Sequence, residues 1–302
     1  MSVVYRGEAG YIALLNDVLQ HGVEVRNERT GTMTKALFDD KFVLDGGEFM
    51  FSTSRPAPLR LAFEEFWSFL RGDLDTKKLE DKGVNFWRGN TSREFLDSRG
   101  LHYLPEGSLG KAYSFQFRNA GGDFNGDYTN AVGGVDQLKR LYEGLRDEPY
   151  GRRHLLTLWN PLQSDEMCLN PCWHSHQFVV LPDGFGGNVL HLKLINRSLD
   201  CLFGFLYAVQ QYRLYQFAMA KLLGMKVGKL SCDLSHVHLY ENQFEFAQEV
   251  VDRDFGTQGT LEITKELNTL DDLLNMKWDD VEVSGLVVNS SPFKTKRPPM
   301  VA

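Results

Sequence analysis

Three long stretches of the chain repeat apolar residues at helical spacing. The first is Tyr11 to His21, and the second is Leu59 to Leu70, which Pro58 opens and Gly72 closes. The third, Phe203 to Leu223, is the longest and contains small residues that permit close packing inside a core. Each of the three predicts a helix, and the last is expected to lie across a sheet. Two further helices are predicted near residues 135–145 and 270–276.

Shorter apolar stretches bounded by turn residues predict strands. Ala36 to Leu44 and Phe49 to Ser52 flank an Asp45-Gly46-Gly47 turn, which predicts a hairpin. Other strands are predicted at His154 to Trp159, Gln177 to Leu181 and Val189 to Ile195. The sequence has no internal repeat and no low-complexity linker. We therefore expect one α/β (α+β) domain that covers residues 1–302.

Composition and charge narrow the function. With 302 residues and 42% hydrophobic content the chain can bury a sizeable core, and a net charge of −7 argues against general nucleic-acid binding. An anionic ligand must be held by local arginines, which suits a small phosphorylated substrate. No stretch approaches the ~18 apolar residues of a membrane span, and the N-terminal run, broken by Asn16 and Asp17, is too weak for a signal peptide. Four cysteines do not make a disulfide scaffold in a chain this long, so we expect a cytoplasmic protein.

Cys172 is the candidate nucleophile. It follows Pro171 and lies nineteen positions after the pair Arg152-Arg153. Cationic neighbours lower the pKa of a thiol and raise the thiolate fraction that a nucleophile needs. The alternatives are a small buried hydrophobic residue, which is the common role of a lone cysteine, or a zinc ligand. The possible zinc ligands are Cys168, Cys172, His174 and His176, whose spacing matches no recognised zinc motif.

Three other polar groups stand out. Glu65 lies inside the apolar run of the second helix, where a carboxylate needs an explanation. The segment Asn196-Arg197-Ser198-Leu199-Asp200 links a strand to the long helix and is either a helix N-cap or a phosphate cradle. His238 and Tyr240 share one face of an extended segment, and are either a structural pair or ligands of a sugar hydroxyl.

Taken together and in order, these residues resemble the thymidylate synthase family over nearly the whole chain. Each motif is weak alone, but their order and their spacings are specific. The matching pieces are Arg29-Thr30-Gly31-Thr32, Glu65 with Trp67, Phe69, Leu70 and Gly72, Trp87, Arg152-Arg153, Pro171-Cys172, Arg197-Ser198-x-Asp200, Gly204, His238-Leu239-Tyr240 and a C-terminal Pro-x-Val-Ala. The resemblance implies a twisted mixed sheet packed with long helices, and a homodimer formed through the sheet face.

The resemblance also implies a mechanism. Cys172 looks like the nucleophile that adds to C6 of a pyrimidine, so that C5 attacks the one-carbon unit of 5,10-methylenetetrahydrofolate. Glu65 looks like the carboxylate that organises proton transfer through water, which predicts a perturbed pKa. Tyr113 resembles the tyrosine implicated in removing the C5 proton, although Ser114 and Phe115 replace the family's usual Gly-Lys. The residues that resemble the family's catalytic set are Cys172, Glu65, Tyr113, Asp200 and Arg197.

Ligand contacts can be carried over in the same way. The residues that resemble the phosphate contacts are Arg29, Arg197 and Ser198, joined by Arg152 and Arg153 from the other subunit of the homodimer. His238 and Tyr240 resemble the pair on the sugar 3′-hydroxyl, and Asp200 also belongs to the substrate site. Trp87, Asp200 and the Ala302 carboxylate resemble the folate contacts and the closing group of the site. No metal is implied.

Two departures from the family concern the base. Members that act on deoxyuridylate have an asparagine eleven residues after the arginine of Arg197-Ser198, where this chain has Ala208, and a histidine after the catalytic cysteine, where it has Trp173. A site that loses such donors and acceptors loses discrimination. We therefore expect deoxycytidylate as the substrate, with Glu65, Gln210, Gln211 or ordered water as the group that binds the base. Methyl is favoured over hydroxymethyl as the product, because Trp87 and the C-terminal tail favour a dry site. The alternatives are an ordinary deoxyuridylate enzyme, or a catalytically inactive nucleotide- or RNA-binding relic of the fold.

Overall fold

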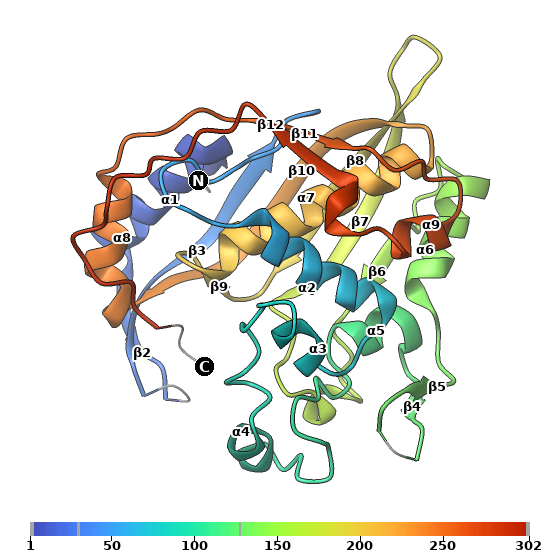
Figure 1. Ribbon diagram of the computed structural model, residues 1–302, viewed down its shortest axis with the longest axis horizontal. Coiled ribbons are helices and arrows are strands. Elements are labelled where there is room, and N and C mark those ends of the chain that lie inside the picture. Colours follow the sequence, from blue (N-terminus) through green and yellow to red (C-terminus); the bar gives the residue numbers. More distant parts are fainter. Residues whose placement is uncertain (1–2, 29–30, 127, 300–302) are drawn as a thin grey trace.

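A mixed β-sheet forms the centre of the computed structural model, which describes residues 3–28, 31–126 and 128–299 (Figure 1). Within these ranges the strands of the sheet are β1 (Val4–Arg6), β2 (Val23–Arg26), β3 (Met33–Leu44), β6 (Leu155–Thr157), β7 (Trp173–Pro182), β8 (Asn188–Asn196), β9 (Leu199–Asp200) and β10 (Lys226–Tyr240). Their order is β1-β3-β10-β8-β7-β6, with β2 paired to β3 and β9 to β10. A mixed sheet packed with helices confirms the predicted α+β fold class.

β10 holds the sheet together. It pairs antiparallel with β3 on one side and parallel with β8 on the other. Because side chains alternate along a strand, Leu230, Cys232 and Leu234 face the core, and His238 and Tyr240 lie farther along the same face. The strand therefore runs from the packed core to the place where the functional residues gather.

Helices cover the core face of the sheet. α7 (Gly204–Leu222) packs directly on β8 and β10, α2 (Leu59–Arg71) packs on α7, and α1 (Gly7–His21) packs on β3 (Figure 1). α2 ends where the sequence predicts, since Gly72 adopts the left-handed conformation, with φ of 85°, that suits a helix C-terminus. In the described ranges, no helix is both long enough and apolar enough to cross a membrane.

Shorter elements surround this core. The helices are α3 (Lys77–Glu80), α4 (Arg93–Ser98), α5 (Ser114–Asn119), α6 (Gln137–Asp147), α8 (Phe244–Val251) and α9 (Leu270–Leu274). The strands pair as β4 (Asp123–Phe124) with β5 (Ala131–Val132), and β11 (Thr260–Ile263) with β12 (Val281–Ser284). α6 and α9 correspond to the two shorter helices that the sequence predicts.

The predicted hairpin is wrong in its second strand. β3 covers Ala36 to Leu44, but Phe49 to Ser52 forms no strand. The Gln258 side chain replaces a partner strand there: its Oε1 accepts from the Phe51 N–H and its Nε2 donates to the Phe51 carbonyl, both at 2.9 Å. β3 instead pairs antiparallel with the short, exposed β2. The apolar residues of Phe49 to Ser52 therefore indicate that this segment is buried, but they do not show that it pairs with another strand.

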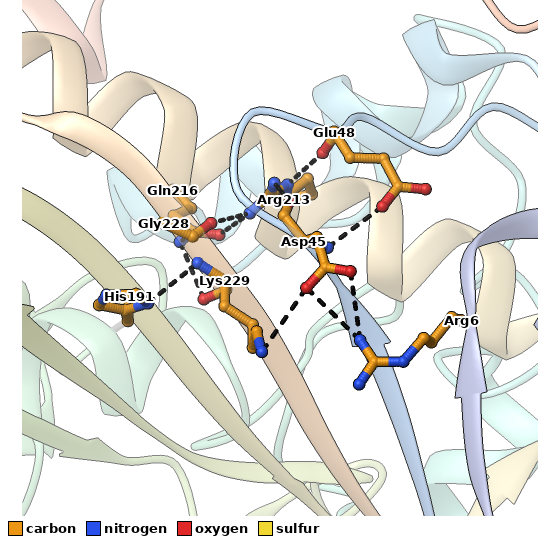
Figure 2. Close-up of polar contacts among 8 residues, drawn as sticks. All are labelled: Arg6, Asp45, Glu48, His191, Arg213, Gln216, Gly228 and Lys229. Carbon is orange, nitrogen blue, oxygen red and sulfur yellow. Dashed lines mark hydrogen bonds and ion pairs between the residues drawn. The ribbon is translucent and has the colours of Figure 1, made fainter.

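Arg213 of α7 joins the ends of β3 and β10 to the helix layer (Figure 2). Its guanidinium is fully buried and donates to the carbonyls of Asp45, Glu48 and Gly228 at 2.6–2.8 Å, and to Gln216 Oε1 at 2.6 Å. Burial lowers the pKa of Arg213 to about 10, so the group stays charged at neutral pH. The charge is thus satisfied mainly by backbone carbonyls that would otherwise lack partners.

We expect Arg213→Met to lower the free energy of unfolding by about 3 kcal/mol, because it leaves several buried carbonyls without donors. Arg146→Met is the matched control, since Arg146 is half-exposed, pairs with its neighbour Asp147 and lies over the Tyr142 ring; its expected effect is below about 0.5 kcal/mol. Urea unfolding measures both. Equal midpoints for the two variants would contradict the role of Arg213.

Candidate active site

A cavity of about 700 Å³ opens where α2, α7 and the end of β10 meet the loops around Trp87 and Cys172. This volume is typical of pockets that bury small molecules. The predicted site residues that line it are Glu65, Trp87, Tyr113, Cys172, Arg197, Ser198, Asp200, Ala208, His238 and Tyr240. Residues that are distant in sequence are therefore brought to one place.

Of the predicted site residues that the structure describes, two do not line this cavity. Arg152 and Arg153 are exposed, just before the edge strand β6, and line no part of it. Their contact with phosphate from a second subunit stays a prediction. Arg29 and Ala302 lie outside the described residues.

Cys172 differs from the other three cysteines in its exposure. Cys168, Cys201 and Cys232 are completely buried, whereas Cys172 is partly exposed and lines the cavity. Burial raises the pKa of Cys168 to about 12 and the pKa values of Cys201 and Cys232 well above that of an ordinary thiol. Those three thiols stay protonated, so Cys172 is the cysteine available as a nucleophile.

Arg197 holds the loop that carries Cys172. Its Nε donates to the Pro171 carbonyl at 2.9 Å, its Nη2 donates to the Asn170 carbonyl at 2.6 Å, and its backbone N–H donates to the Cys172 carbonyl at 3.0 Å. The guanidinium lies 5.4 Å from the ring centre of Trp159. Arg197 therefore fixes the loop and places a positive charge at this end of the cavity.

Tyr113 lies against the backbone of the nucleophile. Its hydroxyl oxygen accepts from the Cys172 N–H at 3.0 Å, and its ring stacks on Phe69 and meets the edge of Trp87. Burial raises the pKa of Tyr113 well above its ordinary value, so it remains a phenol whose O–H can donate. Its backbone φ is positive, 21° with ψ of −85°, a conformation that non-glycine residues adopt at a cost of about 1–3 kcal/mol.

Glu65 is a buried carboxyl group on α2, 8% exposed. Its Oε1 accepts from Trp87 Nε1 at 2.6 Å and its Oε2 accepts from Gln211 Nε2 at 2.5 Å. Burial raises the pKa of Glu65 to about 7, although both hydrogen bonds oppose the shift. This confirms the expected perturbed pKa. A carboxyl group that changes protonation near neutral pH suits acid–base chemistry.

Gln211 is the one of the two candidate base readers on α7, Gln210 and Gln211, that lines the cavity. It is 6% exposed and follows Ala208 by three positions, so both reach the same cavity from α7. Trp173 also lines the cavity at 6% exposure. At the positions that concern the base, the wall therefore has a methyl group and an indole, next to the Glu65–Gln211 pair. The signal in the sequence was the polar pair Gln210-Gln211 directly after the apolar start of the helix.

Asp200 holds the turn that leads into α7 and also lines the cavity. Its Oδ1 accepts from the backbone N–H groups of Leu202 and Phe203 at 3.0 Å, and its Oδ2 accepts from Gln243 Nε2 at 3.0 Å. These bonds stabilise the turn in the manner of a helix cap and fix the orientation of a carboxylate at the cavity wall. Its contact with a ligand stays a prediction.

Aromatic rings form the wall above the nucleophile. Phe86 and Tyr207 lie 4.8 Å apart, and Phe69 and Trp87 lie 5.9 Å apart, measured between ring centres. All four line the cavity. Flat apolar surfaces of this kind stack on heteroaromatic rings, so the wall suits a ligand with a fused ring system, with Asp200 as its polar neighbour.

The zinc alternative has no ligand set in the described part of the chain. No group of three His, Cys, Asp or Glu side chains there could hold a metal ion. His176 is fully buried among the rings of Phe117, Phe178 and Tyr215, and burial lowers its pKa to about 3.

Comparison with known proteins agrees with this geometry. The family profile described as thymidylate synthase matches residues 9–293. The thymidylate synthase of Saccharomyces cerevisiae is 33% identical over 91% of this chain and 92% of its own, and that of Homo sapiens is 32% identical over 92% and 87%. The bifunctional dihydrofolate reductase-thymidylate synthase of Leishmania major is 35% identical over 88% of this chain. The match spans about half of that bifunctional relative, 51% of its length.

Proposed function

Because the chain belongs to the thymidylate synthase family, we propose that it transfers a one-carbon unit to C5 of deoxycytidylate, with Cys172 as the covalent nucleophile. Thymidylate synthases use methylenetetrahydrofolate as the one-carbon donor. Folate supplies the carbon and, for a methyl product, the hydride that reduces it, leaving as dihydrofolate. The aromatic wall of Phe69, Phe86, Trp87 and Tyr207 fits its fused ring.

The residues of this chain account for the covalent steps. The Cys172 thiolate forms a bond to C6, and the electron pair of the C5–C6 double bond moves to C5, which then attacks the donated carbon. The C5 proton must leave next. Tyr113, whose hydroxyl lies against the Cys172 backbone, and Glu65, whose pKa is about 7, are the groups placed to move it. Loss of the C5 proton breaks the bond between the transferred carbon and the folate nitrogen. After the folate hydride has reduced that carbon to methyl, elimination of the thiolate from C6 restores the double bond and frees Cys172.

The Glu65–Gln211 pair carries the proposal for the base. Gln211 Nε2 donates to Glu65, which leaves the Gln211 amide oxygen and the carboxylate as acceptors at the wall. Cytosine has an amino donor at C4, whereas uracil has a carbonyl acceptor there. Hydrogen-bond acceptors on the wall attract the C4 amino group of cytosine and repel the C4 carbonyl of uracil. Ala208 and Trp173 supply no amide or imidazole to a uracil ring.

Turnover assays with methylenetetrahydrofolate and either deoxycytidylate or deoxyuridylate test the proposal. We expect deoxycytidylate to be preferred, with dihydrofolate formed and a methyl group gained in the product mass. Ala208→Asn should raise the ratio of kcat/KM for deoxyuridylate over deoxycytidylate by about 100-fold, because it restores an amide. Ala208→Ser, of similar size but without an amide, is the control. Turnover of deoxyuridylate alone by the wild type would reject the cytosine proposal.

We further propose a homodimer formed through the outer face of the sheet. Leu155, Val179 and Leu181 lie on that face and are 37–53% exposed. Adjacent exposed apolar residues favour burial against a partner, and Arg152 and Arg153 at the same edge would then reach a second subunit. Sedimentation equilibrium would measure the oligomeric state, and we expect a dimer. A monomer with full turnover would contradict the shared site.

The cysteines support a reducing compartment. The four cysteines form no disulfide with one another, and three of them are completely buried. Cysteines outside disulfides are typical of proteins that function in reducing compartments. We therefore place the protein in the cytoplasm.

A further inference from the structure

We propose that His236 is a positioning residue that fixes the ring orientation of His238 for recognition of the nucleotide's 3′-hydroxyl. The inference rests on the proposed nucleotide site. His236, His238 and Tyr240 all line the cavity from β10. His238 is buried, at 6% exposure, whereas His236 is exposed.

The two imidazoles are directly bonded. Nδ1 of His236 lies 3.2 Å from Nδ1 of His238, and the ring centres are 5.1 Å apart. On its other side the His238 ring meets the Tyr240 ring at 5.0 Å, nearly perpendicular at 89°. His238 is therefore held between two side chains of its own strand, each two positions away.

The strand itself keeps this row in place. His236 and His238 pair with Phe38 and Ala36 of β3, and the His238 carbonyl accepts from the Cys201 N–H at 2.9 Å. β9 also pairs with β10 at His238. With the backbone fixed on both sides, the orientation of the His238 ring is set by its side-chain contacts, and the bond to His236 is one that restrains rotation of the ring.

The bond also couples the protons of the two rings. A neutral imidazole has one N–H, so a bond between two Nδ1 atoms requires one ring to carry its proton on Nδ1 and the other on Nε2. When His238 donates from Nδ1 its Nε2 is an acceptor, and when it accepts at Nδ1 its Nε2 is a donor. A sugar hydroxyl both donates and accepts, so it can bond to the oriented Nε2 of His238 in either state.

The test asks whether the effect of removing His236 depends on the 3′-hydroxyl of the nucleotide. Calorimetry would measure binding of deoxycytidylate and 2′,3′-dideoxycytidylate, and of the matching uracil pair, to the wild type and to His236→Ala. We expect His236→Ala to weaken the 3′-hydroxyl nucleotides by about 5–10-fold and to leave the dideoxy nucleotides unchanged. His236→Asn, whose amide can bond to His238, should restore most of the loss. Phe38→Ala, an exposed neighbour across the strands, is the control.

The possible outcomes distinguish the positioning role of His236 from the proposed function of the protein. Equal weakening of hydroxyl and dideoxy nucleotides by His236→Ala, or no weakening of either, would overturn the positioning role. Failure of the wild type to bind any of the four nucleotides would contradict the proposed function, and this inference with it. Because binding is measured without folate, the result does not depend on which base is turned over.

Discussion

Cys172→Ala is expected to reduce turnover by at least about 10⁴-fold while the protein stays folded. The other three thiols are completely buried and protonated, so none of them can replace the lost nucleophile. Cys172 is only partly buried, so removing its sulfur creates little cavity. Product formation at saturating nucleotide and folate, together with a thermal melt, would measure both effects.

Cys232→Ala is the matched control for this variant. Cys232 lies on β10 in the core and does not line the cavity. Its loss should cost about 1 kcal/mol in stability and leave kcat within about threefold of the wild type. If Cys172→Ala retained kcat comparable to that of Cys232→Ala, covalent catalysis by Cys172 would be refuted.

Glu65→Gln is expected to have the second largest effect, lowering kcat by about 10²–10³-fold. A glutamine cannot exchange protons with the base. It also has one acceptor oxygen, where the carboxylate receives N–H groups from both Trp87 and Gln211. The wild type should show a pH dependence of kcat with a transition near 7, where Glu65 titrates, and the variant should lack it. A variant that kept the transition would assign it to another group.

Glu65→Gln should raise the free energy of unfolding at high pH, although it lowers kcat. Folding raises the pKa of Glu65 from 4.5 to about 7, so the neutral form is favoured in the folded protein. The stability that this contributes is present below pH 4.5 and is lost as the pH rises through 7. Glutamine stays neutral, so the variant should gain about 3 kcal/mol on the wild type between pH 5 and pH 9.

Urea unfolding at these two pH values measures the difference. Glu64→Gln is the control on the same helix, since Glu64 pairs with Lys82 near the surface. Its difference from the wild type should stay within about 1 kcal/mol over this range. Parallel behaviour of the Glu64 and Glu65 variants would show that burial does not govern Glu65. Ionised Glu65 lowers the stability of the folded protein. Such a cost is expected for a residue that is retained for its function in the site.

The sequence predicted the helices better than the sheet. Pro58 and Gly72 bracket α2 because the ends of helices have local chemical signals. The partner of a strand has none, and Phe49 to Ser52 was therefore assigned to a hairpin although the Gln258 side chain bonds its backbone. β10 pairs with β3 on one side and with β8 on the other. These partners are distant in the sequence, so no local pattern predicts the pairing. That residues 1–302 form one catalytic domain stays a prediction.

The candidate site could be predicted where a residue's chemistry conflicts with its surroundings. Glu65 stood out as a carboxyl group in an apolar helix, and its raised pKa has that cause. Gln211 could not be separated from Gln210 by sequence, because only the packing of α7 decides which of them reaches the cavity. The contact of His236 with His238 likewise depends on ring orientation, which strand alternation alone does not determine.

The most direct test of the account is covalent trapping by 5-fluorodeoxycytidylate in the presence of methylenetetrahydrofolate. Fluorine at C5 cannot leave as a proton, so the reaction should stop after the sulfur–C6 and C5–carbon bonds have formed. Intact-mass spectrometry followed by peptide mapping would detect the product. The account predicts a complex of protein, nucleotide and folate with the modification on Cys172. No adduct, an adduct on another residue, or trapping by 5-fluorodeoxyuridylate alone would contradict it.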